Sequence, residues 1–295
     1  MIRKRVLNRV GILALGLTMF ACNEDATQVE DVVVEDVDTV QAEVEVSFRE
    51  SMDEDYHLPS ALQVASIFKK SGLSYNAETT NDVDNVTNYT SDVQGKLNFG
   101  VYSADLAYCI ANEQANDARK VISAVQVLAE QQGMESVFEN KSLMERFDKN
   151  LEIQDSIQNM IIEIHEKSQE YLEENDMTHV AAIHYAGAWA EGMYLGVWDF
   201  ENNENSDKES IGFKLTEQME ILRNIIKGLK DPRNEDADLN WIITDLEKVQ
   251  ASFDDFESVK TYIASNFEGE LTLTDDEIMI VGGMIKEIRG KIVQK

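Results

Sequence analysis

Apolar residues recur with a helical period along most of the chain from residue 58 onward. The first predicted helix covers 59–71, with Pro59 near its first turn and Gly72 after its end. Further helices are predicted at about 97–112, 117–132, 134–139, 142–174, 178–200, 207–230, 237–251, 255–267 and 274–293. No alternation of period two persists for more than a few residues. The pattern therefore predicts an all-α fold, a multi-helix bundle of antiparallel neighbours.

Polar residues mark where these helices begin and end. Residues 73–95 are rich in Asn, Asp, Thr and Ser and predict a long loop. Pro232 marks a break before the last three helices. Thr274 is followed by Glu277 three residues later, which is the spacing of a capping box. We therefore expect the final helix to begin at Thr274.

The first residues have the pattern of a secretory signal. Four basic residues and no acid come first, and an apolar run from Val10 to Ala21 follows. The run is too short to span a membrane, which takes ~20 apolar residues. Because Cys22 comes directly after the run, the segment resembles a bacterial lipoprotein signal, in which Cys22 is lipidated and becomes the first residue of the mature chain. The alternative is an ordinary signal peptide, 1–21, with an incidental cysteine.

An acidic segment separates this signal from the helices. Residues 23–56 hold 13 acids and a single base, Arg49. Runs of like charge stay solvated, so 22–56 is predicted to be a disordered tether carrying the lipidated cysteine, and 57–295 an all-α domain.

The net charge excludes one class of partner. The chain has 26 Lys and Arg against 56 Asp and Glu, a formal net charge of −30, and removal of the signal takes away four more bases. Such a surface repels phosphate, so we expect no binding to nucleic acid.

The segment 180–198 is apolar or small almost all round. Its ionisable groups, tyrosines aside, are His184 and Glu191. A helix without a polar face is central and buried. Small residues recur at every fourth position, as Ala182, Ala186 and Ala190, and again as Gly192 and Gly196. We therefore expect another helix to approach this one closely.

A second segment, 98–108, has a similar pattern at an offset of 86 residues from 184–194. The matched pairs are Phe99 with Tyr185, Ala104 with Ala190, Asp105 with Glu191, and Tyr108 with Tyr194. This match suggests a duplicated helical hairpin. Each copy has one acid in an apolar helix and a tyrosine about one turn later.

Several segments together resemble a set of uncharacterised helical lipoproteins of Bacteroidota. They are Gly100-Val101-Tyr102-Ser103-Ala104-Asp105-Leu106, Asn150 to Asp155-Ser156, Tyr171-Leu172 with Asn175, and Gly187-Ala188-Trp189-Ala190-Glu191-Gly192-Met193-Tyr194. The resemblance covers about 58–230. It implies a helical fold and a place in the cell envelope, and it implies no activity.

Asp105 and Glu191 need a physical explanation, because an unpaired buried carboxylate is costly. Each could accept hydrogen bonds that fix the packing of the central helices, or line a ligand pocket in the core. A carboxylate-bridged metal site is the third interpretation, but it needs Glu-x-x-His on two helices and the predicted helices contain none. The candidate ligand-binding residues are Tyr102, Asp105, Tyr108, His184, Trp189, Glu191 and Tyr194. No catalytic residue, metal ligand or cofactor is assigned.

Cys109 lies in an apolar helical stretch without a basic neighbour in sequence. We expect it to be a small buried hydrophobic residue and not a nucleophile. The chain also contains no P-loop, no Gly-x-Gly-x-x-Gly and no Gly-x-Ser-x-Gly.

These patterns predict an outer-membrane lipoprotein, periplasmic or surface-exposed, with a non-catalytic interaction or ligand-binding domain. Its partners would be the membrane, through the lipid, and an envelope protein or a small ligand. Two alternatives stay open. One is a metal-dependent or carboxylate-based enzyme that uses Asp105, Glu191 and His184, and the other is a purely structural scaffold.

Overall fold

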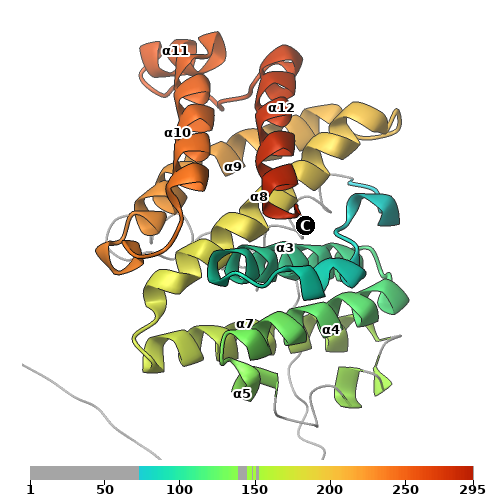
Figure 1. The fold of residues 1–295 in the computed structure, drawn as a ribbon. Helices are drawn as coiled ribbons and strands as arrows, with labels where there is room; N and C mark the ends of the chain where they lie inside the picture. The colour runs from blue at the N-terminus through green and yellow to red at the C-terminus, as the bar shows by residue number, and fades with distance from the viewer. Residues whose placement is uncertain (1–72, 139–144, 148, 151–152, 295) are drawn as a thin grey trace, which may run out of the picture. The chain divides into compact units, whose positions relative to one another are not determined.

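The chain folds into helices joined by short connections (Figure 1). The computed structural model describes residues 73–138, 145–147, 149–150 and 153–294. Within these ranges every regular element is a helix and none is a strand, which confirms the predicted all-α fold. The predicted signal, Cys22, the acidic tether and the helix at 59–71 lie outside the described residues.

The α-helices follow the sequence prediction closely, with ends displaced by a few residues. They are α3 (Asp92–Ala111), α4 (Ala115–Gln131), α5 (Glu135–Phe138), α7 (Gln154–Glu174), α8 (Thr178–Asn202), α9 (Lys208–Leu229), α10 (Asn240–Asp255), α11 (Glu257–Ala264) and α12 (Asp275–Ile292). Short 3-10 turns lie at Ala77–Thr79, Val83–Asn88 and Pro232–Asn234, the last at the predicted break. Thr274 and Glu277 form the predicted capping box.

The prediction of one long helix over 142–174 is wrong. The helix α7 begins only at Gln154, and Ile153 before it is extended. The last helical bond of the preceding segment joins the N–H of Asn150 to the carbonyl of Arg146 at 3.0 Å. The N–H of Ile153 then donates to the carbonyl of Asn150 at 2.8 Å, which is the three-residue spacing of a turn. The apolar period runs through the turn and hides it.

The helices α3 and α8 cross at very short range. A Cβ atom on Gly100 would lie 1.8 Å from the carbonyl oxygen of His184, and one on Gly187 would lie 1.9 Å from that of Leu97. The two backbones therefore touch, and only glycine fits at either position. The expected close approach is present, with Gly100 and Gly187 at its tightest point.

Two apolar cores lie on either side of this crossing. One contains Ile122 of α4 and Met160 of α7, and the other contains Leu222 of α9 and Ile285 of α12. The helix α3 contributes to both cores, and α8 passes through the second for most of its length. Because these two helices are covered on most sides, they lack a polar face, as the sequence predicted. Among the described residues, no helix is both long and apolar enough to cross a membrane.

Candidate functional site

The two central acids meet at the crossing of α3 and α8. Asp105 and Glu191 both have no exposed surface. Glu191 accepts two hydrogen bonds from Arg289, one from Nε at 2.9 Å and one from Nη2 at 3.1 Å. This is the bidentate pairing that guanidinium and carboxylate groups favour. It joins the last turn of α12 to the centre of α8.

Arg289 is held from three sides. Its Nη2 also donates to the carbonyl of Thr79 at 3.3 Å, and its guanidinium carbon lies 4.6 Å from the ring centre of Tyr194. The side chain is only 16% exposed. Burial disfavours the charged guanidinium, but the Glu191 carboxylate outweighs it, so the pKa of Arg289 is raised.

Asp105 lies beside this pair and has fewer partners. Its Oδ2 accepts from the backbone N–H of Asn81 at 3.0 Å, whereas Oδ1 has no hydrogen-bond partner among the described residues. Burial raises the pKa of Asp105 and repulsion by Glu191 raises it further, while Arg289 and the Asn81 N–H act in the opposite direction. The net shift is well above the ordinary value. Two carboxyl groups therefore share one guanidinium, and Asp105 keeps its proton to a higher pH than a free aspartate.

A buried polar network continues from these acids to the end of α12. Asn98 has no exposed surface, and its amide donates to the carbonyl of Ile292 at 2.9 Å. Tyr89, also fully buried, donates to the carbonyl of Val293 at 3.3 Å and accepts from the amide of Asn81 at 3.0 Å. The loop before α3 and the end of α12 are thus fastened together through side chains.

The sequence analysis missed Arg289, Asn81 and Asn98. Arg289 lies in the last turn of α12, where a basic residue also complements the helix dipole. Asn81 lies in a polar loop, and its 4% exposure is a property of the tertiary fold alone. Asn98 was the one detectable signal, because an amide within an otherwise apolar helical stretch needs a buried partner.

The predicted tyrosines of α3 bond to the loop that precedes the helix. Tyr102 donates to the carbonyl of Asp82 at 2.8 Å. Tyr108 donates to the carbonyl of Ser74 at 2.6 Å and accepts from the N–H of Asn76 at 2.7 Å. Both hydroxyls therefore hold the loop on the surface of α3.

His184 and Trp189 form hydrogen bonds with residues of neighbouring segments, not with the acids. Trp189 is fully buried and donates from Nε1 to the carbonyl of Gln218 at 3.1 Å. The ring of His184 bonds through Nε2 to Oε1 of Gln132 at 2.6 Å and lies 4.5 Å from the ring of Phe99. Burial, aided by a nearby lysine, lowers the pKa of His184 to about 3. His184 precedes Glu191 by seven residues, about 10.5 Å along the helix, so the structure separates it from the acids.

Among the described residues, the geometry supports neither a metal site nor a reactive cysteine. Within the described ranges, no group of three His, Cys, Asp or Glu side chains could hold a metal ion. Cys109 is fully buried, and burial raises its pKa to about 12. The prediction that Cys109 is a small buried hydrophobic residue is confirmed.

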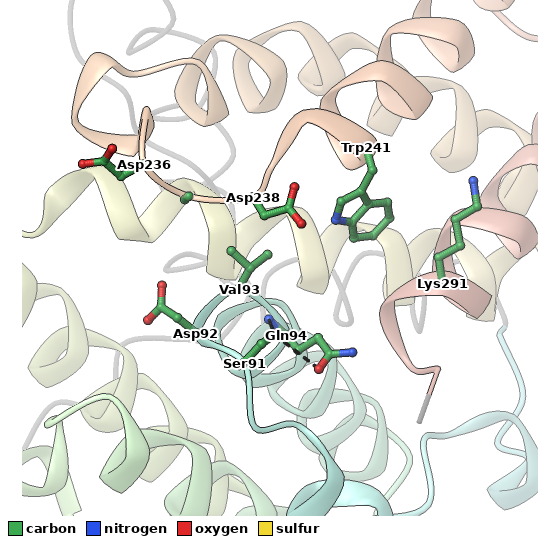
Figure 2. A pocket seen from close by; sticks show the side chains of 9 residues that line it. Ser91, Asp92, Val93, Gln94, Asp236, Asp238, Trp241 and Lys291 are labelled. Atoms are coloured by element: carbon green, nitrogen blue, oxygen red, sulfur yellow. Dashed lines mark hydrogen bonds between the residues drawn. The ribbon is translucent and has the colours of Figure 1, made fainter.

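A surface hollow of about 650 Å³ lies away from the acids (Figure 2). Its walls are Ser91–Gln94 at the start of α3, the turn at 236–238, Trp241 of α10 and Lys291 of α12. A second hollow of about 480 Å³ lies between the end of α9 and Pro232. None of the seven predicted ligand-binding residues lines either hollow.

The aligned acids of the suggested duplication, Asp105 and Glu191, meet at the crossing, although the duplication itself stays a prediction. Comparisons with protein-family models, with curated proteins and with solved structures found no match. The resemblance to Bacteroidota lipoproteins therefore also stays a prediction.

Proposed function

We propose that the chain is a lipid-anchored protein of the cell envelope whose helical domain is a non-catalytic binding module. The order of basic residues, apolar run and Cys22 supports the anchor and an outer-membrane location. Two or more acyl chains give a stable attachment to a membrane. The domain would then act at the periplasmic side or at the cell surface.

One observation carries the non-catalytic assignment. The strongest candidate acid, Glu191, is fully buried, and both of its carboxylate oxygens accept hydrogen bonds from Arg289. A catalytic acid or base must come within hydrogen-bond reach of a substrate. Asp105 is equally buried, and the hydroxyls and ring nitrogens of Tyr102, Tyr108, Trp189 and His184 bond to the chain itself. These residues hold helices together and leave binding to the surface.

The anchor is tested by labelling cells that express the full chain with a fatty-acid analogue. We expect label on the full chain and partition into the detergent phase, and neither for Cys22→Ala. Cys109→Ser is the matched control and should keep both. Equal labelling of the Cys22→Ala chain would refute lipidation at Cys22.

The binding assignment is tested by thermal-shift screening of the full chain with metal ions and small molecules, since a ligand of the native state raises the unfolding temperature. We expect any stabilising compound to keep its effect in Asp105→Asn. A divalent metal whose effect disappears in both Asp105→Asn and Glu191→Gln would instead support the metal-dependent alternative.

A further inference from the structure

The hollow at the start of α3 has an aromatic wall. Figure 2 shows Asp238 and Trp241 along one side of the hollow, Val93 and Gln94 across from them, and Lys291 beyond Trp241 on the side away from Asp238. Asp238 belongs to the turn before α10, and Trp241 is the second residue of that helix. The Asp238 carboxylate lies on the side facing the indole.

The position of Trp241 is fixed by its neighbours in sequence. Leu239 and Ile242 are 2% and 0% exposed and anchor the first turn of α10 in the core. Trp241 packs against the same core on one side and borders the hollow on the other. A large, rigid aromatic surface is therefore presented to solvent at a defined place.

The charges around the hollow are unevenly compensated. Asp92 is paired with Lys96 at 2.7 Å, and Lys291 is paired with Asp245 at 2.5 Å. Asp238, in contrast, has no hydrogen bond or ion pair through its carboxylate among the described residues. The same holds for Asp236, which also borders the hollow. Two carboxylates on the side of the hollow away from Lys291 thus have no pairing partner among the described residues.

The start of α3 does not attract anions strongly enough to offset the negative charge of Asp236 and Asp238. Ser91 accepts a hydrogen bond from the backbone N–H of Gln94, and Asp92 in the first turn opposes the positive end of the helix. The chemistry next to Trp241 is therefore that of an anion beside an aromatic face, which is the combination that proteins use to recognise ammonium groups.

We infer that this hollow binds a small organic cation that carries one ammonium group, with the ammonium between the ring of Trp241 and the carboxylate of Asp238. The volume of about 650 Å³ is in the range of small-molecule sites. One aromatic face and one adjacent carboxylate make a place for a single ammonium group. This inference rests on the proposed binding function and names its ligand class.

The test is a fluorescence titration of the full chain in detergent with tetramethylammonium chloride, at constant ionic strength. tert-Butanol has nearly the same shape without the charge, and sodium acetate supplies an anion. We expect a saturable change with tetramethylammonium alone. The response should disappear in Trp241→Phe and persist in Trp198→Phe, because Trp198 lies on α8 and does not line the hollow.

Charge variants test the geometry. Asp238→Asn should weaken binding by about threefold to tenfold, as expected for the loss of one close anionic contact. Lys291→Gln should tighten binding, because it removes a positive charge from the lining of the hollow beside Trp241. Asp276→Asn, an exposed acid at the start of α12, should leave binding unchanged. Thermal unfolding of each variant checks that the fold is retained.

Several results would overturn the inference. One is the absence of a saturable fluorescence change with tetramethylammonium up to about 100 mM, a concentration well above the Kd of a specific site. The others are an equal response to tert-butanol, stronger binding of acetate, and equal effects of Asp238→Asn and Asp276→Asn on binding. Failure here is distinguishable from failure of the proposed function. The fatty-acid label on Cys22 is measured independently, and a ligand found by thermal shift that does not require Trp241 would place binding elsewhere.

Discussion

Glu191 and Asp105 lie together in the core, but their substitution should affect stability in opposite ways. Glu191→Gln removes the charge that neutralises Arg289, whose side chain is only 16% exposed. Asp105→Asn replaces a carboxyl group whose pKa is raised by burial with a neutral group of the same shape. The amide oxygen of Asn at this position can still accept from the N–H of Asn81.

The structure sets the size of both effects. Breaking a buried ion pair by removing one partner costs about 3–5 kcal/mol. Asp105 lies close enough to Glu191 and Arg289 for their charges to shift its pKa, so it can ionise and replace part of the lost charge. We therefore expect Glu191→Gln to lower the free energy of unfolding by about 2–3 kcal/mol. Asp105→Asn should leave it unchanged or raise it.

The pH profile gives a second readout of the same reasoning. Because the pKa of Asp105 is raised above 3.8 in the folded chain, the folded state keeps a proton that the unfolded state releases. The stability contributed by this proton is fully present below pH 3.8 and is lost as the pH rises through the raised pKa. The loss amounts to about 1.4 kcal/mol per pH unit within that interval. Asp105→Asn should remove this slope.

The assay is urea unfolding of the full chain and its variants between pH 4 and pH 8, followed by circular dichroism, with Asp276→Asn as an exposed control. The double variant Asp105→Asn/Glu191→Gln should lose more than the two single effects combined, because Arg289 then has neither acid. If Asp105→Asn destabilises the chain as much as Glu191→Gln, or if its pH profile matches that of the unmodified chain, the assignment of the proton to Asp105 is wrong.

Three further predictions concern the central helices. Gly100→Ala should lower the free energy of unfolding by more than about 3 kcal/mol or prevent folding, because its Cβ would lie 1.8 Å from a backbone oxygen. The Cβ of Gly290→Ala meets nothing within 4 Å, so this variant should be more stable by up to about 1 kcal/mol. Equal thermal unfolding temperatures for the two variants would refute the close crossing. The pKa of His184 is about 3 in the folded chain against an ordinary value of 6.5, so the stability that its neutral ring contributes is fully present above pH 6.5 and is lost as the pH falls toward 3. His184→Asn should flatten the decline of the free energy of unfolding at acid pH, measured by urea unfolding. An unchanged decline would contradict the burial of a neutral ring. Cys109 should react with a thiol reagent only after unfolding in a Cys22→Ser chain, and rapid labelling of the native chain would contradict its burial.

The fold was largely predictable from the sequence because helix positions depend on local pattern. The stretch 180–198 has no polar face, and α8 is indeed buried along most of its length. The capping box at Thr274 is a local signal and was found. The break before α7 was missed because the apolar period continues through it.

The candidate site was predictable only in part. The two acids were identified because an ionisable group in an apolar helix stands out. Their cation was not, because Arg289 follows Glu191 by 98 residues and lies on a helix that carries other charged residues. Pairing of residues so far apart in the sequence depends on how α12 packs against α8, and the apolar periodicity of the sequence does not contain that information. The hollow at Trp241 was missed for the same reason, since its walls come from segments far apart in the sequence.

The long separation between Glu191 and Arg289 has a consequence for the order of assembly. Before α12 docks, α3 and α8 can pack together only with the Glu191 carboxylate buried without its counter-ion. The centre of the domain is therefore complete only once α12 has docked.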